Sequence, residues 1–145
     1  MHVLVVDDEP DLVMLCRMHL ESQGHRVSVA LSGDEGLAAV WADVPDVVLL
    51  DFMMPGTDGL TVLERMRRET DPGANVPVVM LSAKGRPEDA LRGLSAGATA
   101  YVTKPFALDE LEALLNAVVQ ESSAERDLRR TRALAALTAD RESRR

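Results

Sequence analysis

The sequence of 145 residues has little cysteine and few aromatic side chains. It contains one cysteine, Cys16, and only 3% of its residues are Phe, Trp or Tyr. One cysteine cannot form an internal disulfide and supplies too few thiolates for a structural zinc site. We therefore expect a core built from Val, Leu, Ala and Met, with Cys16 as a small apolar member of it.

Long apolar runs and an excess of positive charge are also absent. No run approaches the roughly 20 apolar residues that span a membrane, and the start of the chain does not resemble a signal peptide. The formal net charge of −8 argues against direct binding to nucleic acid or to an anionic membrane. We therefore expect a cytoplasmic chain that binds neither nucleic acid nor membranes by itself.

Short apolar segments alternate with amphipathic segments of helical spacing along the first 119 residues. The apolar segments are rich in β-branched residues, which favour strands. Three of them are apolar almost throughout, which is typical of strands covered on both faces of a parallel sheet. The expected strands are residues 2–6, 26–30, 46–50, 76–81 and 99–103.

Five strand–helix units in series predict an α/β fold with a doubly wound, flavodoxin-like parallel sheet in the order 2-1-3-4-5. Two helices should cover one face of the sheet and three the other. We expect residues 1–119 to form this domain and residues 120–145 to form a helical C-terminal tail or linker. The tail has no Pro or Gly to stop a helix, so the fifth helix is expected to extend to about Leu137.

Acidic side chains, one hydroxyl and one lysine stand at the ends of these strands. Asp7 and Asp8 follow the first strand and Asp51 the third, while Ser82 and Lys104 end the fourth and fifth. Ligands of such sheets bind at the carboxyl ends of the strands, between strands 1 and 3. Each pair of carboxylates 4 Å apart repels by about 4 kcal/mol at an effective dielectric of 20. A hard dication such as Mg²⁺, which prefers oxygen ligands, would offset this repulsion.

The same groups suit phosphoryl transfer. Asp51 would be a carboxylate nucleophile that can form an acyl phosphate. Lys104 would pair with the phosphoryl group as a point charge, and Ser82 would donate a hydrogen bond to one of its oxygens. The turn after Asp51, with the sequence FMMPGTDG, would let backbone groups approach the metal and the phosphate.

This set of residues resembles the receiver domain of bacterial two-component response regulators over about residues 1–119. Five motifs carry the resemblance, in order at the strand ends: Asp7-Asp8, Asp51 with MMPGTDG, Ser82-Ala83, Tyr101, and Lys104-Pro105-Phe106. The resemblance implies that a sensor histidine kinase or phosphotransfer protein phosphorylates Asp51. It also implies that the chain is not an enzyme beyond its own phosphorylation and slow dephosphorylation.

The family resemblance also assigns the metal ligands. It implies that Mg²⁺ is held by Asp51, by Asp7 or Asp8, and by the backbone carbonyl of Met53. Asp8 is the expected direct ligand of the acidic pair, because the second acid usually has that role in the family.

The resemblance further implies a switch made by Ser82 and Tyr101. The hydroxyl would move toward the phosphoryl group, and the aromatic ring would rotate inward behind it and alter a distal protein-interaction face. The peptide bond between Lys104 and Pro105 is expected to be cis, as is usual in the family.

Several alternatives can be weighed from the residues. A flavin or nucleotide binder would need a Gly-, Ser- or Thr-rich phosphate loop after the first strand, where this chain has DDEPD. A haloacid-type phosphatase would need its D-x-D motif there. A degenerate receiver that acts as a constitutive interaction module remains the alternative. The 26 residues after residue 119 are too few for a helix-turn-helix effector domain, so the sequence does not reveal the output. The downstream effector protein is unknown, the tail is either a contact helix or the start of a linker to an effector domain outside these 145 residues, and we expect a monomer or weak homodimer.

Overall fold

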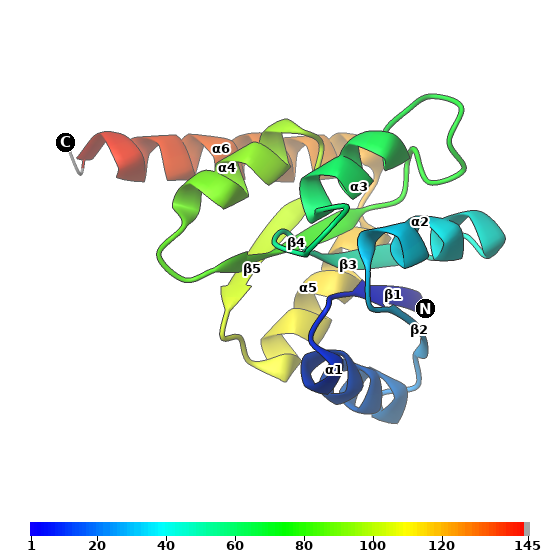
Figure 1. Cartoon of the computed structure of the whole chain (residues 1–145). Helices are drawn as coiled ribbons and strands as arrows, with labels where there is room; N and C mark the ends of the chain where they lie inside the picture. Colours follow the sequence, from blue (N-terminus) through cyan, green and yellow to red (C-terminus); the bar gives the residue numbers. More distant parts are fainter. Residues whose placement is uncertain (144–145) are drawn as a thin grey trace.

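The computed structural model describes residues 1–143, which form a five-stranded parallel sheet with helices on both faces (Figure 1). The strand order is β2-β1-β3-β4-β5, which confirms the expected topology. The elements are β1 His2–Val6, α1 Pro10–Ser22, β2 Arg26–Ala30, α2 Gly33–Ala42, β3 Val47–Asp51, α3 Gly59–Met66, β4 Val78–Ala83, α4 Pro87–Ser95, β5 Ala100–Lys104, α5 Leu108–Gln120 and α6 Ser123–Ser143.

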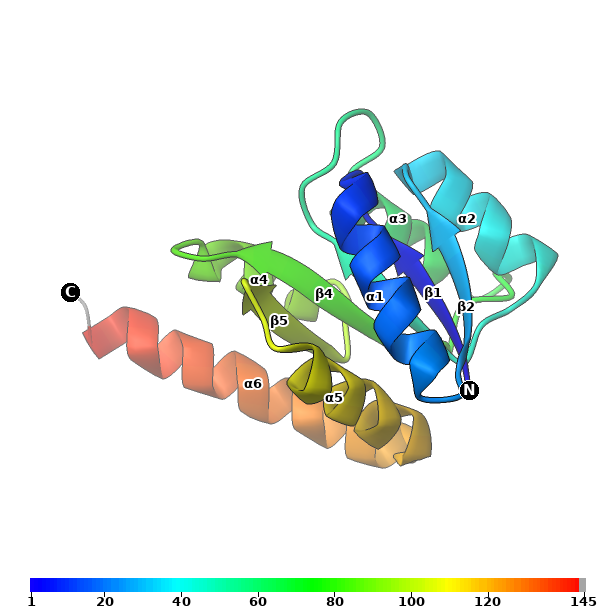
Figure 2. The same cartoon turned by 90° about the horizontal axis from the view of Figure 1, so that it is seen from below.

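Two helices cover one face of the sheet, and the other helices cover the opposite face (Figures 1 and 2). Successive strand residues point to opposite faces, so Val3 and Val5 pack in the layer with α1 and α5. Leu4 and Val6 pack in the layer with α2, α3 and α4. Cys16 is fully buried in the first layer. The expected division of two helices against three is confirmed, with α6 added to the second layer.

The strand register brings the ends of the central strands to one edge. Val6 of β1 pairs with Leu50 of β3, so the residues that follow them, Asp7 and Asp51, are neighbours. Asp51 in turn pairs with Leu81 of β4. The pairing of β4 with β5 continues this row, so the last residues of all four strands reach the same edge of the sheet.

Helix α3 begins directly against the end of β3. The Asp58 carboxylate accepts a hydrogen bond from the backbone N–H of Thr61 at 2.8 Å and caps the helix. A Cβ atom at Gly59 would lie 2.0 Å from the backbone oxygen of Asp51. Only glycine therefore allows the turn after Asp51 to fold back so closely, which explains the DG pair in this turn.

Arg67 holds two loops together at the opposite end of the sheet. Its Nε donates a hydrogen bond to the backbone oxygen of Gly97 at 3.0 Å. Its Nη1 donates to the backbone oxygens of Val76 at 2.7 Å and of Gly73 and Ala74 at 3.3 Å. The loop before β4 and the loop before β5 therefore share one half-buried guanidinium.

We expect Arg67→Met to lower the free energy of unfolding by about 2 kcal/mol, because several backbone carbonyls lose a charged donor. Arg68→Met is the matched control, since Arg68 is exposed and forms no side-chain hydrogen bond within residues 1–143. Urea denaturation of both variants measures the difference. Equal stability of the two variants would contradict the assignment of Arg67 as a link between these loops.

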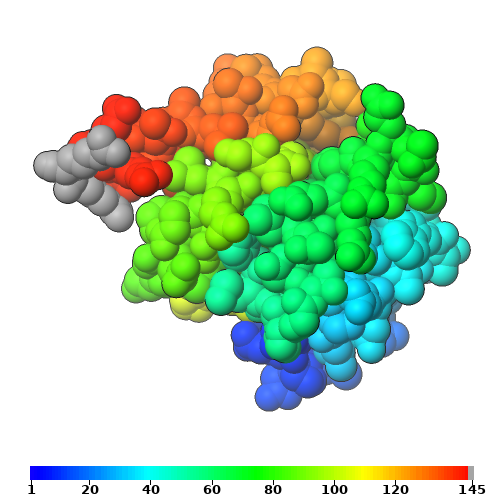
Figure 3. Space-filling view, turned by 45° about the horizontal axis from the view of Figure 1, so that its top comes forward, coloured from blue at the N-terminus to red at the C-terminus, as the bar shows by residue number. Residues whose placement is uncertain are grey.

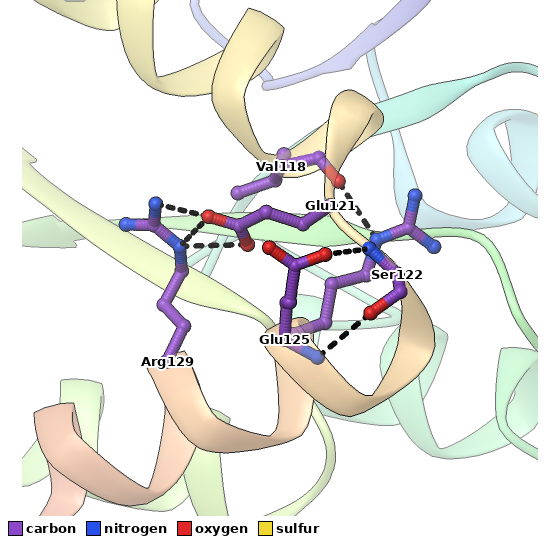
Figure 4. Close-up of polar contacts among 6 residues, drawn as sticks. Val118, Glu121, Ser122, Glu125 and Arg129 are labelled. Carbon is purple, nitrogen blue, oxygen red and sulfur yellow. Dashed lines mark hydrogen bonds and ion pairs between the residues drawn. The ribbon is translucent and has the colours of Figure 1, made fainter.

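The expected continuous fifth helix is wrong, although the tail is helical. Helix α5 ends at Gln120, and Glu121 takes an extended conformation with φ −73° and ψ 147°. The Ser122 hydroxyl accepts a hydrogen bond from the N–H of Glu125 at 3.1 Å, and the Glu125 carboxylate accepts one from the N–H of Ser122 at 3.0 Å. This reciprocal capping box starts a new helix, shown in Figure 4. Helix α6 then packs on α4 and β5.

Within residues 1–143, the structure contains no helix that combines the length and apolar character needed to cross a membrane.

Candidate functional site

Three carboxylates meet at the carboxyl edge of the sheet, between β1 and β3. Asp7, Asp8 and Asp51 each offer an oxygen, and these oxygens all lie within 4.8 Å of one another. Asp7 is fully buried and Asp51 is 5% exposed, while Asp8 is partly exposed. The structure therefore brings together the three acids that the sequence places at strand ends, and the set is able to hold a hard divalent cation.

Lys104 reaches this cluster from the end of β5. Its Nζ lies 2.9 Å from Oδ2 of Asp7, 3.5 Å from Oδ1 of Asp51 and 3.2 Å from Oε1 of Glu9. The peptide bond that follows it, to Pro105, is cis as expected. The sequence did not predict the contact between Lys104 and Glu9. The one feature that could have indicated it is that Glu9 is the third consecutive acid after β1.

The cluster disfavours the charged form of its buried carboxyls. Burial and the nearby charge of Asp7 raise the pKa of Asp51 to about 7, although Lys104 and the backbone N–H of Met53 act in the opposite direction. Burial also raises the pKa of Asp7, against the hydrogen bonds from Lys104 and from the backbone N–H of Glu9. A cation beside these oxygens would favour their ionised forms, so the chemistry of the donor set fits a metal.

Lys104 itself remains a cation in this setting. Burial alone would lower the pKa of the ammonium group. The hydrogen bond to Asp7 and the charge of Asp51 outweigh burial and raise the pKa of Lys104. The ammonium group of Lys104 therefore stands as a positive charge among three acids, Asp7, Glu9 and Asp51.

The two acids that follow β1 differ in how their oxygens are used. Oδ1 of Asp7 accepts a hydrogen bond from the N–H of Glu9 at 2.9 Å, and Oδ2 pairs with Lys104. The Asp8 carboxylate forms no hydrogen bond or ion pair with any residue between 1 and 143. Asp8 is therefore the member of the pair with the greater freedom to bind a cation.

Ser82 lies at the same edge, one residue after the partner of Asp51 in β4. Its side chain is buried, with 3% of the residue exposed, and its hydroxyl forms no hydrogen bond within the described part of the chain. The side chain of Met53 is exposed, while its backbone N–H approaches the Asp51 carboxylate. Ser82 therefore stands at the edge of the sheet where the sequence places it, and the role of the Met53 carbonyl as a metal ligand stays a prediction.

Tyr101 does not belong to the acidic cluster. It is half-buried, pairs with Met80 across β4 and β5, and packs against the core layer under α2, α3 and α4. Tyr101 lines a cavity of about 470 Å³ together with Leu128 and Ala133 of α6. The predicted switch aromatic therefore faces the C-terminal helix, a neighbour that sequence reasoning missed.

Comparison with known proteins adds a family to this geometry. Residues 3–116 match the family described as the response regulator receiver domain. Over 121 residues the chain is 44% identical to the transcriptional regulatory protein TrcR of Mycobacterium tuberculosis (strain ATCC 25618 / H37Rv), an alignment that covers 83% of this chain and 46% of TrcR. The chain spans about half the length of the curated relatives it matches.

Solved structures match the same fold. The receiver domain of NtrX from Brucella abortus superimposes with a TM-score of 0.76 at 34% identity, covering 83% of this chain and 99% of that one. A longer NtrX chain, in complex with ADP, matches 98% of this chain and 29% of its own length, with a TM-score of 0.73 at 31% identity. The second alignment extends into α6, so the helix after the sheet domain also has a counterpart there.

Proposed function

Because the chain belongs to the response regulator receiver domain family, a signalling module rather than an enzyme, we propose that it is a phosphorylation-dependent switch with Asp51 as its phosphoacceptor. One observation carries the proposal. Asp51 ends a buried central strand, and both an acidic pair and the ammonium group of Lys104 lie within reach of its carboxylate. The donor would be a sensor histidine kinase or a phosphotransfer protein.

The chain's own residues have distinct parts in this reaction. The Asp51 oxygen attacks the phosphorus of the donor phosphohistidine, the P–N bond breaks, and an acyl phosphate forms. Lys104 pairs with the phosphoryl oxygens, and the Ser82 hydroxyl donates a hydrogen bond to one of them. Rigid positioning and charge neutralisation supply the rate enhancement, as in other phosphoryl transfers.

The metal would be Mg²⁺, held by Asp51, by Asp8 or Asp7, and by the backbone carbonyl of Met53. When bound, it would neutralise the carboxylates and clamp the phosphoryl oxygens. The unpaired Asp8 carboxylate supports its assignment as the direct ligand of the acidic pair. Asp7 would then hold Lys104 in place through their ion pair.

The conformational change caused by phosphorylation would be transmitted through Ser82 and Tyr101 to a distal protein-interaction face. We assign residues 1–119 to the receiver domain and residues 120–145 to a C-terminal tail, which is helical over Ser123–Ser143 and whose last two residues lie outside the described part of the chain. The protein would be cytoplasmic and a monomer or weak homodimer. The downstream effector is a protein that recognises the switched face. Nucleic acid is not proposed as a direct ligand of these 145 residues.

The proposal is tested by incubating the full chain with acetyl phosphate and measuring its intact mass. We expect one added phosphoryl group with Mg²⁺ and none with EDTA. Asp51→Asn should gain none, whereas Asp11→Asn, which changes an exposed acid in the first turn of α1, should behave like the wild type. A wild-type chain that gains no phosphoryl group from acetyl phosphate or from phosphoramidate would favour the degenerate receiver instead.

A further inference from the structure

Helix α6 covers the face formed by α4 and β5. Figure 1 shows α6 running behind α4, and Figure 2 shows it passing beside α5 and β5. In the space-filling view of Figure 3, the orange surface of α6 lies against the yellow-green surface of α4. The tail is therefore part of the folded domain in this structure and covers one of its faces.

A short apolar stripe holds α6 in place. Leu137 is 9% exposed and joins the core under α2, α3 and α4, while Ala133 and Leu134 pack against that core. These three residues share one face of the helix by their spacing. Leu137 is the one buried residue among residues 123–143. Docking therefore depends strongly on a single side chain.

Polar contacts at the junction fix the direction in which α6 leaves α5 (Figure 4). Nε of Arg126 donates to the backbone oxygen of Val118 at 2.7 Å, and Nη2 donates to that of Val119 at 3.1 Å. Nε of Arg129 lies 3.0 Å from both carboxylate oxygens of Glu121. The first turns of α6 are thus anchored to α5, independently of the stripe that contacts α4.

Like charges oppose the docking of α6. Arg67, Arg126 and Arg130 line one cavity of about 360 Å³, with Asp127 as the only acid among its lining residues. Burial, and then the charges of Arg130 and Arg126, lower the pKa of Arg67 to about 10. The docking of α6 on the domain therefore combines a small apolar contact with unfavourable charge between Arg67, which caps α3, and the first turns of α6, as is expected of a contact that can open.

The helix that α6 covers is tied to the phosphoacceptor. The Arg92 guanidinium of α4 lies 5.6 Å from the ring centroid of Phe52, the residue after Asp51. Gly93 of α4 approaches β4 so closely that an added Cβ would lie 3.1 Å from Cγ of Met80. These two contacts connect α4 with the residue after β3 and with the middle of β4. They provide a path by which a displacement at Asp51 can reach α4 and the surface on which α6 rests.

From this geometry we infer that α6 is an autoinhibitory helix: it occupies the face of α4 and β5 and is released when Asp51 is phosphorylated. The inference rests on the proposed function of Asp51. A phosphoryl group on Asp51 adds negative charge beside Lys104, whose ammonium group already contacts three acids at this edge of the sheet. The resulting shift of α4 separates Leu137 from the core under α2, α3 and α4, because the apolar stripe of α6 packs against α4 in its unphosphorylated position. Release exposes the apolar stripe and the covered face together.

The docking itself is tested by hydrogen–deuterium exchange on the full, unphosphorylated chain. Leu137→Gln should speed amide exchange in residues 127–143 about tenfold, and Ala136→Gln should leave it unchanged because Ala136 is exposed on the same helix. Equal exchange in the two variants would overturn the inference. Protection of α6 in the wild type should not depend on protein concentration. Protection that appears only at high concentration would assign the contact to a second copy and overturn the inference as well.

The link to Asp51 is tested in the same variants. Coupled binding equilibria act in both directions, so Leu137→Gln should also tighten the binding of beryllofluoride, a mimic of the phosphoryl group, about fivefold, while Ala136→Gln should not. Phosphorylated wild type should show faster exchange in residues 127–143 than the unphosphorylated chain. A fully phosphorylated chain with unchanged exchange there would refute the release of α6 but leave the proposed function intact. A chain that gains no phosphate would refute both.

Discussion

Asp51→Asn should stabilise the metal-free protein by on the order of 3–4 kcal/mol at about pH 8. The pKa of Asp51 is raised from 3.8 to about 7 by burial and by Asp7. Between those two values the folded chain keeps a proton that the unfolded chain releases. The contribution of Asp51 to the free energy of unfolding therefore falls as the pH rises from about 4 to about 7, and it stays low above that. Asparagine removes this penalty.

The measurement is urea denaturation in EDTA of the wild type and Asp51→Asn across this pH range. The stability difference should be small at about pH 4, grow up to about pH 7, and then level off. Asp11→Asn, which alters an exposed acid, should track the wild type. A stability difference that does not change with pH would show that the pKa of Asp51 is not raised in the folded protein.

Asp8→Ala should weaken Mg²⁺ binding at least tenfold, or by about 1.4 kcal/mol. Asp8 belongs to the triad that can hold a metal, and its carboxylate has no other partner within residues 1–143. The same substitution removes a charge that raises the pKa of Asp51. The metal-free variant should therefore be no less stable than the wild type.

Asp11→Ala is the matched control for Asp8→Ala. It removes the same charge a few residues further along the chain, outside the triad, and should change Mg²⁺ affinity less than twofold. Calorimetric titration with Mg²⁺ compares the two variants. Equal weakening by both substitutions would mean that the cation senses only the general acidity of this edge and is not bound by Asp8.

Much of the site could be predicted because it depends on regular features of the chain. The apolar strands fix the sheet, and the crevice rule places Asp7 and Asp51 side by side at its carboxyl edge. The register of β1 with β3 and of β3 with β4 agrees with this. Lys104 could be assigned to the cluster because it ends β5, and the carboxyl ends of all parallel strands meet at this edge.

The C-terminal helix could not be predicted in the same way. The absence of Pro and Gly favoured a continuous helix, but the capping box of Ser122 and Glu125 decides the outcome. The spacing of a capping box is present in the sequence SSAE, residues 122–125, but helix propensity alone favours a helix that continues through it. The packing of Leu137 on the core depends on a partner that is remote in sequence, so no local pattern specifies it.

Gly93 shows a second limit of local reasoning. Helix propensity alone favours alanine over glycine inside a helix by about 1 kcal/mol. In the structure, Gly93 is buried against Met80, and an added Cβ would lie 3.1 Å from a side-chain carbon close to the β4 backbone. Overpacking of this kind commonly costs as much as or more than propensity contributes, so the glycine permits the close approach of α4 to the sheet.

The central claim, that Asp51 accepts the phosphoryl group, is tested most directly by locating the acyl phosphate. The wild-type chain is phosphorylated by acetyl phosphate with Mg²⁺ and reduced with borohydride, which converts an aspartyl phosphate to homoserine, and its peptides are then mapped by mass. We predict homoserine at position 51 alone, and none when EDTA replaces Mg²⁺. Homoserine at Asp7 or Asp8, or its absence from position 51 in a chain that carries phosphate, would contradict the account.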